Sequence, residues 1–199
     1  MNPLEIVAAL FGVISVFLSV RQNIWSWPTA IVNVGLYIIV FYGSKLYSDT
    51  GLQVVYVVLN AYGWYHWLYG GKNRTELPVT RTRAPVAAVL VALVAAGTAI
   101  IGTFLSRNTD AALPWVDAMT TSVSLAAQWM MTRKLLENWI IWVAVDVVYI
   151  AMYIYKSLYV TSGLYLVFLI LSAMGFVEWR RSLADRERSG PNVEPAVSV

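Results

Sequence analysis

The segment 138–155 of this 199-residue chain carries aromatic and acidic side chains at helical intervals. Trp139, Trp142, Asp146 and Tyr149 follow one another at steps of three, four and three positions, which places them on one face of a helix. A flat heterocycle stacks well between such rings, and a cationic ring gains cation–π attraction and a carboxylate partner as well. A neutral hexose would not require the carboxylate. We therefore expect this face to bind a flat, cationic solute.

Polar stripes of the same kind run along three other apolar segments. Polar side chains are costly when they face lipid, so we expect the stripes to converge on one cavity. The predicted substrate-binding set comprises Asn138, Trp139, Trp142, Asp146 and Tyr149 in segment 138–155, Gln53, Tyr56, Asn60 and Trp64 in segment 50–71, Thr121, Ser124 and Gln128 in segment 111–132, and Asn33 and Tyr37 in segment 23–44. Thr121 and Ser124 fit a role as interhelical hydrogen-bond partners equally well.

Catalytic chemistry finds little support in the sequence. The chain has no cysteine and a single histidine, His66, and it contains no HExxH or GxSxG motif. Asp117 and Asp146 are expected about a leaflet apart, too far for a carboxylate pair. We expect no catalytic residue, metal or cofactor. A membrane-embedded enzyme remains a rival interpretation, as does a binding subunit or sensor that does not transport; the missing Walker A sequence argues against a chain powered by its own nucleotide hydrolysis.

The composition indicates that membrane helices position these residues. Hydrophobic residues make up 59% of the chain and charged residues only 13%, whereas soluble domains carry about 25% charged residues. Charge-poor runs, each close to the length of about 20 residues that crosses a bilayer, cover 6–20 (extended to residue 3), 23–44, 50–71, 84–105, 111–132, 138–155 and 157–177. The sequence predicts an all-α transmembrane protein with seven helices.

The distribution of Lys and Arg predicts the orientation. With the N-terminus outside, 11 of the 14 basic residues fall in cytoplasmic segments and 3 in outer segments. We expect a multi-pass protein of the bacterial inner membrane, with the N-terminus outside and the C-terminus in the cytoplasm. Basic residues of a nucleic-acid-binding protein would not need to alternate between successive loops, so no nucleic-acid partner is expected.

An internal repeat organises the segments. Residues 21–67 match residues 133–179 without a gap at an offset of 112, with 13 identities in 47 positions. We call this constant spacing the repeat offset. Paired Trp and Gly residues, such as Trp27 with Trp139, are rarely matched by chance. Each repeat unit spans three helices, and one unmatched helix between the units gives both the same orientation.

The predicted organisation is therefore 3+1+3, with two parallel three-helix repeats. The first repeat covers 3–71, a connector helix covers 84–105, and the second repeat covers 111–181. Asn33 and Tyr37 are expected to matter less for binding, because Val34 stands at the position that matches Asp146. The polar tail 182–199 is expected to be disordered in the cytoplasm.

At these residues the chain resembles the PnuC-type vitamin transporters. The resemblance covers about residues 3–181 and rests on the stretches RQNIWSWPTAIVN, LNAYGWYHW and TRKLLENWIIWVAVDVVYIAMYIYK. Its most specific part is the pair of tryptophans at 139 and 142. The resemblance implies a fold like that of full-length SWEET sugar transporters.

The resemblance also implies a function. The family implies uptake of nicotinamide riboside by facilitated diffusion, with phosphorylation inside the cell trapping the vitamin. Thiamine or riboflavin, which relatives take, is the alternative substrate. The expected partners are this small-molecule vitamin and the lipid bilayer. The sequence leaves open which vitamin is carried, whether an ion is coupled and whether the chain forms a homo-oligomer.

Overall fold

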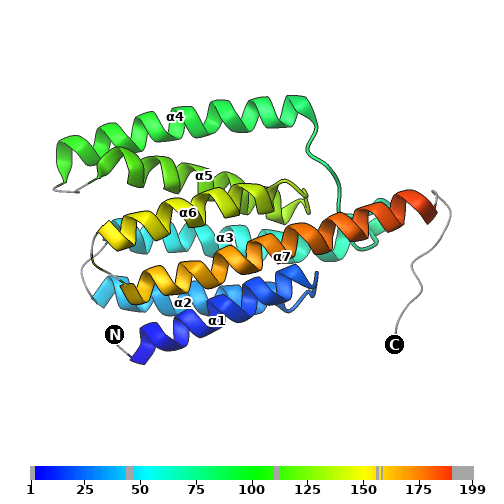
Figure 1. Cartoon of the computed structure of the whole chain (residues 1–199), viewed down its shortest axis with the longest axis horizontal. Coiled ribbons are helices and arrows are strands. Elements are labelled where there is room, and N and C mark those ends of the chain that lie inside the picture. The colour runs from blue at the N-terminus through cyan, green and yellow to red at the C-terminus, as the bar shows by residue number, and fades with distance from the viewer. Residues whose placement is uncertain (1–2, 44–46, 110–112, 156, 158, 190–199) are drawn as a thin grey trace.

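Seven α-helices make up the part of the chain that the computed structural model describes, residues 3–43, 47–109, 113–155, 157 and 159–189 (Figure 1). The helices are α1 (Pro3–Val20), α2 (Ser26–Gly43), α3 (Tyr47–Tyr69), α4 (Ala84–Asn108), α5 (Pro114–Thr132), α6 (Asn138–Tyr155) and α7 (Tyr159–Ser189). A short 3-10 turn, Lys72–Arg74, follows α3. The expectation of an all-α fold is confirmed, and each apolar run of the sequence corresponds to one helix.

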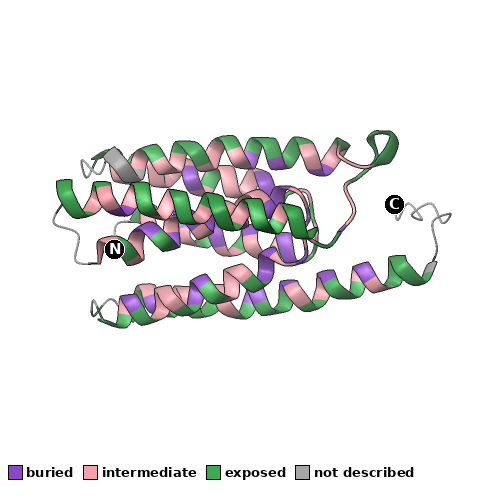
Figure 2. Ribbon diagram, turned by 90° about the horizontal axis from the view of Figure 1, so that it is seen from above, coloured by how far each residue is buried: buried purple, intermediate pink, exposed green. Residues whose placement is uncertain are grey.

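Five of these helices, α1, α2, α4, α6 and α7, are long and apolar enough to cross a membrane, judged over the described residues. The helices α3 and α5 are long enough but less apolar, because they carry the polar stripes with Asn60 and Gln128. Buried residues lie between the helices, whereas the outward faces are exposed (Figure 2). Large apolar side chains cover those faces, as expected where helices meet lipid.

The last helix is longer than the sequence suggested. A disordered tail was expected from residue 182, but α7 continues as a helix to Ser189. The reason is tertiary packing, since Leu183 is buried in an apolar cluster with Val79 and Leu136. Residues 190–199, the remainder of the expected tail, lie outside the described residues.

Helices that follow one another pack against one another within two groups. The first group is α1, α2 and α3, and the second is α5, α6 and α7. Between the groups, α1 packs against α7 and α5 packs against α3, so the first helix of each group meets the last helix of the other. The helix α4 packs against α5 and lies at the edge of the bundle (Figure 1).

Two hydrogen bonds tie the groups together and are related by the repeat offset. The Trp67 indole N–H donates to the Met131 carbonyl over 3.0 Å, and the Trp179 indole N–H donates to the Ser19 carbonyl, also over 3.0 Å. Trp67 matches Trp179 at the repeat offset, and Ser19 matches Met131. Each bond joins the last helix of one group to the end of the first helix of the other.

The aromatic rings around these bonds repeat the same relation. Trp27 meets Trp67 edge-on at 5.2 Å and 88°, and Trp139 meets Trp179 at 5.3 Å and 89°. Trp67 and Trp179 also contact each other, at 5.8 Å between ring centroids. All four tryptophans are buried. We call Trp27, Trp67, Trp139 and Trp179 the tryptophan layer.

The turns beside this layer share an unusual backbone conformation. Gln22, after α1, has φ of 54°, and Lys134, after α5, has φ of 48°. Both residues lie in the left-handed region, which few non-glycine residues adopt. They too match each other at the repeat offset. The chain therefore reverses in the same way between the first and second helices of each group.

Basic residues gather at one end of the bundle. The connections α1–α2, α3–α4 and α5–α6 lie at this end, together with the C-terminal part of α7 (Figure 1). These segments contain Arg21, Lys72, Arg74, Arg81, Arg83, Arg133, Lys134, Arg180, Arg181, Arg186 and Arg188. We call it the basic end.

The indole–carbonyl bonds should contribute measurably to stability. Trp179→Phe keeps most of the ring volume and removes the indole donor, while the Ser19 carbonyl keeps its bond from the Gln22 N–H, so we expect a loss of about 0.5–1.5 kcal/mol. Thermal unfolding of the protein in detergent measures the change. Trp25→Phe is the control, because Trp25 is 64% exposed. Equal melting temperatures for the two variants would contradict a stabilising role for the bond.

Candidate functional site

A buried carboxyl group lies in the middle of α6. Asp146 is 3% exposed and accepts a hydrogen bond from the Ser172 hydroxyl of α7 at 3.1 Å. Asp146 is eight residues from Asn138, the first residue of α6, so about 12 Å of helix separates it from the basic end. In the part of the chain that the structure describes, the hydrogen-bond partner of this carboxyl group is Ser172.

A second polar pair lies at a similar depth, between α3 and α5. The Gln128 side-chain amide of α5 donates to the Asn60 side-chain oxygen of α3 at 2.9 Å. Asn60 is nine residues from Tyr69, the end of α3, or about 13 Å of helix. Two predicted site residues from different segments are thus brought together, and both groups of helices contribute polar side chains at mid-depth.

Tyrosine rings cluster on the far side of Asp146 from the basic end. Tyr149 and Tyr153 of α6 lie 4.7 and 5.2 Å from Tyr165 of α7, measured between ring centroids, and Tyr165 also contacts Phe168. Tyr149 additionally lies near Ser124 on α5. We call Tyr149, Tyr153 and Tyr165 the tyrosine cluster. It connects the predicted residues of α6 with those of α5.

Along the bundle axis, the polar pairs therefore lie between two aromatic groups. The tryptophan layer lies toward the basic end and the tyrosine cluster toward the opposite end. Trp142, which is half-buried, lies between the tryptophan layer and Asp146 along α6 and packs against the layer. Rings that flank a carboxyl and amide groups can hold a flat polar ligand by stacking and hydrogen bonding.

Several predicted residues have other contacts in the structure. Trp139 is packed in the tryptophan layer, and the Asn138 amide donates to the Leu135 carbonyl beside it. The Asn33 amide donates to the Ala8 carbonyl of α1 at 2.6 Å, which is an interhelical structural bond. Tyr37 stacks on Phe41 in the same helix. For Asn138, Trp139 and Asn33, the contacts described are those of packing.

The remaining predicted residues differ in exposure. Ser124 is buried, Tyr56, Gln53 and Thr121 are half-buried, and Trp64 is 38% exposed. Tyr56 lies near Tyr149 and Ser124, which links α3 to the tyrosine cluster. A role in binding for Gln53, Trp64 and Thr121 stays a prediction.

Three residues of α7 were missed by the sequence analysis. Tyr165, Phe168 and Ser172 contact the residues around Asp146. They match Gln53, Tyr56 and Asn60, respectively, at the repeat offset. Applying that offset to the polar stripe of α3 would have found all three.

The linker between α3 and α4 covers the basic end. The Thr80 backbone N–H donates to the Lys134 carbonyl at 3.0 Å, and the Leu136 N–H donates to the Thr80 carbonyl at 2.9 Å. The Thr82 backbone N–H and hydroxyl both donate to the Glu137 carboxylate, at 2.8 and 2.7 Å. The linker thereby ties α3 and α4 to the α5–α6 turn.

Lys134 is enclosed beneath this linker. It is 5% exposed, and its ammonium lies 4.4 Å from the centre of the Trp67 ring, a cation–π contact. Burial lowers the pKa of Lys134 to about 8, and the nearby Glu76 carboxylate opposes this shift. Val79 of the linker is buried in the same apolar cluster as Trp67. The tryptophan layer and the linker together close the basic end of the bundle.

Metal binding has no candidate site in the described ranges, where no three His, Asp or Glu side chains are grouped to hold an ion. The arrangement offers binding by charge, hydrogen bonding and stacking between helices.

Known proteins with similar sequences are transporters. At 27% identity, the chain is similar to the nicotinamide riboside transporter PnuC of Escherichia coli (strain K12), over 92% of this chain and 87% of that protein. At 26% identity it is similar to the riboflavin/roseoflavin transporter RibM of Streptomyces davaonensis, over 96% of this chain and 90% of that protein. The chain is also 26% identical to the nicotinamide riboside transporter PnuC of Neisseria mucosa, over 90% of this chain and 74% of that protein.

A solved structure has the same fold. The crystal structure of a vitamin B3 transporter, PnuC, superposes with a TM-score of 0.71 at 25% identity, and the match covers 92% of this chain and 84% of that one. The sequence profile of the nicotinamide mononucleotide transporter family matches residues 2–181. The chain is a multi-pass membrane protein and belongs to the nicotinamide mononucleotide transporter family.

Proposed function

We propose that the chain transports nicotinamide riboside, bound between the two groups of helices beside Asp146. The observation that carries this proposal is the buried Asp146 carboxyl group, with Ser172 as its polar partner and aromatic rings on either side. Nicotinamide riboside has a flat cationic pyridinium ring and a hydroxyl-bearing sugar. The ring suits the carboxylate and the aromatic side chains, and the sugar suits the amides of Asn60 and Gln128.

The carboxyl group also bears on the choice between substrates. An ionised carboxylate without a compensating cation is costly at membrane depth, and a cationic ligand removes that cost. The relative RibM is named as a transporter of riboflavin, which is neutral and does not offset the cost of the buried carboxylate. The similarity to RibM makes riboflavin the second candidate, and Asp146 favours the cationic vitamin.

Binding should therefore depend on the charge of Asp146. Asp146→Asn preserves shape and removes the charge, so we expect affinity for nicotinamide riboside to fall by about 1.5–3 kcal/mol, as for a charge-assisted hydrogen bond. Titration calorimetry of the purified protein measures the loss. Asp185→Asn, the same change on the exposed C-terminal part of α7, is the matched control.

Two further measurements sharpen this experiment. Trp142→Ala should weaken binding through lost stacking, and riboflavin, if it binds at all, should be insensitive to Asp146→Asn. If both α6 variants are folded and bind nicotinamide riboside as tightly as the wild type does, the site lies elsewhere and the α6 stripe only packs.

We further propose that the helices form a 3+1+3 arrangement of two parallel repeats, in which α4 is the connector. The recurrence of the indole–carbonyl bonds, the edge-on tryptophan pairs and the left-handed turns at the repeat offset supports this arrangement. The peripheral position of α4 supports it too, because α4 packs against α5 at the edge of the bundle. In this proposal α3 and α5 also cross the membrane, with their polar faces turned inward.

The orientation follows from the basic end. Because basic residues concentrate on the cytoplasmic side of membrane proteins, we propose that the basic end faces the cytoplasm, with the N-terminus outside. A fluorescent or phosphatase reporter fused to the C-terminus should behave as cytoplasmic. If the phosphatase fusion is active and the fluorescent fusion is dark, the C-terminus lies outside and the proposed orientation is wrong.

Transport is proposed to be facilitated diffusion, with accumulation left to phosphorylation inside the cell. The support is that the sequence has no Walker A motif. Liposomes that contain only this protein, held at zero membrane potential, should equilibrate radiolabelled nicotinamide riboside across the membrane. Accumulation above the external concentration under an imposed proton or sodium gradient would instead establish ion coupling.

A further inference from the structure

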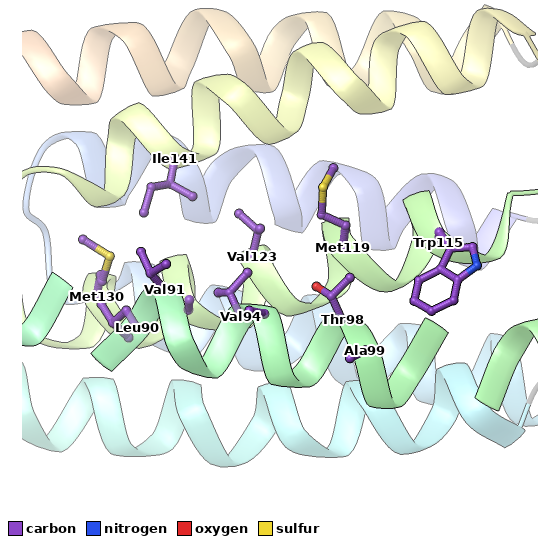
Figure 3. Close-up of a pocket in the computed structure, with 12 residues that line it drawn as sticks. Leu90, Val91, Val94, Thr98, Ala99, Trp115, Met119, Val123, Met130 and Ile141 are labelled. Carbon is purple, nitrogen blue, oxygen red and sulfur yellow. The ribbon is translucent and has the colours of Figure 1, made fainter. Parts of the chain in front are cut away.

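An apolar groove runs along the outside of the bundle, apart from the site around Asp146. Its volume is about 560 Å³, and it lies between α4, α5 and α6. Leu90 and Val94 of α4, Val123 and Met130 of α5, and Ile141 of α6 are among its lining residues (Figure 3). Only Thr98 and Trp115 contribute polar side-chain atoms to the lining.

The position of α4 explains why the groove exists. Because α4 packs against α5 and not closely against α6, a trough remains beside it, with α5 as its floor. The neighbouring faces of α4 carry exposed apolar side chains, such as Leu93 and Ile100. A trough of this kind opens to the hydrocarbon of the bilayer, where its complement is an acyl chain.

The length of the groove fits a lipid tail. Its α5 residues run from Trp115 to Met130, a span of about 22 Å of helix. One leaflet contributes about half of the hydrocarbon thickness of roughly 30 Å. The groove is thus longer than one leaflet is thick, so an extended acyl chain that enters at the basic end can lie in the part of the groove nearer that end.

Charge at one end of the groove identifies the headgroup. Arg81 and Arg83 are exposed and come directly before α4, at the basic end. Leu90, which lines the groove, is seven residues further along, so about 10 Å of helix separates it from Arg83. A phosphate at the membrane interface lies within reach of both guanidinium groups while its tail occupies the groove.

We propose that the groove between α4, α5 and α6 binds one anionic phospholipid, with an acyl chain along α5 and the headgroup at Arg81 and Arg83. The lipid belongs to the cytoplasmic leaflet if the orientation proposed above is correct. The site does not depend on which solute is carried. A bound lipid would fill the trough that the sparse contacts of α4 leave open.

Filling the groove tests the tail site. Ala95 lines the groove and its neighbour Ala96 does not, although both are exposed on α4. Adjacent helical residues point about 100° apart, so Ala95→Trp blocks the groove and Ala96→Trp adds the same ring elsewhere. The measurement is native mass spectrometry of the full-length protein exchanged into micelles with equal phosphatidylglycerol and phosphatidylcholine.

The wild type and Ala96→Trp should each retain one phosphatidylglycerol, and Ala95→Trp should lose it while remaining folded by circular dichroism. Equal lipid retention by the two folded Trp variants would overturn the proposal. A second copy of the chain in place of the lipid, seen as a dimer that Ala95→Trp dissociates, would overturn it too. If Ala95→Trp does not fold, the arginine variants described next test the lipid site instead.

Removing charge tests the headgroup site. The double change Arg81→Gln with Arg83→Gln should weaken phosphatidylglycerol retention by about 30-fold, since each basic residue near the surface attracts an anionic lipid. Lys72→Gln with Arg74→Gln removes the same charge from the same linker and should have little effect. Equal effects of the two pairs, or equal retention of phosphatidylcholine and phosphatidylglycerol by the wild type, would overturn the assignment.

Discussion

The two indole–carbonyl bonds across the tryptophan layer set the frame on which the rest of the bundle depends. Trp67 donates to the last turn of α5, and Trp179 donates to the last turn of α1, so each group of helices is anchored to the other by the same contact. Bonds of this kind fix both the spacing and the rotation of the helices, because an indole N–H has a single direction in which to donate. The depth at which Asn60 of α3 meets Gln128 of α5 follows from that registration.

Within this frame, the candidate site is built where the matched positions differ. Asp146 corresponds to Val34, and Trp142 corresponds to Ala30. The contacts that hold the groups together therefore recur at the repeat offset, whereas charge and stacking surface are concentrated on α6. A ligand with one charged ring needs one carboxylate, and a second buried carboxylate at Val34 would add a desolvation cost with no partner.

Much of the architecture was predictable because bilayer crossing demands long apolar runs, and seven such runs gave the seven helices. The convergence of Asn60 and Gln128 was also predictable, since side-chain amides in apolar helices need hydrogen-bond partners. The sequence could not identify Ser172 directly, because a serine in an apolar helix also serves as interhelical glue. Nor could it reveal the extension of α7: residues 182–189 look like a polar tail, and the burial of Leu183 among Val79 and Leu136 is a tertiary contact that the sequence does not show.

The packing at the basic end leaves four buried polar groups without partners in the described structure. The indole N–H groups of Trp27 and Trp139 are buried without an acceptor in the described structure, and so are the side-chain oxygens of Ser26 and Asn138 beside them. Each such group costs about 1–3 kcal/mol relative to a satisfied one. Bonds from Trp67, Trp179 and the linker stabilise the packing at this end, while the unpaired donors and acceptors lower its net stability. Water that reached these four groups would recover part of that cost.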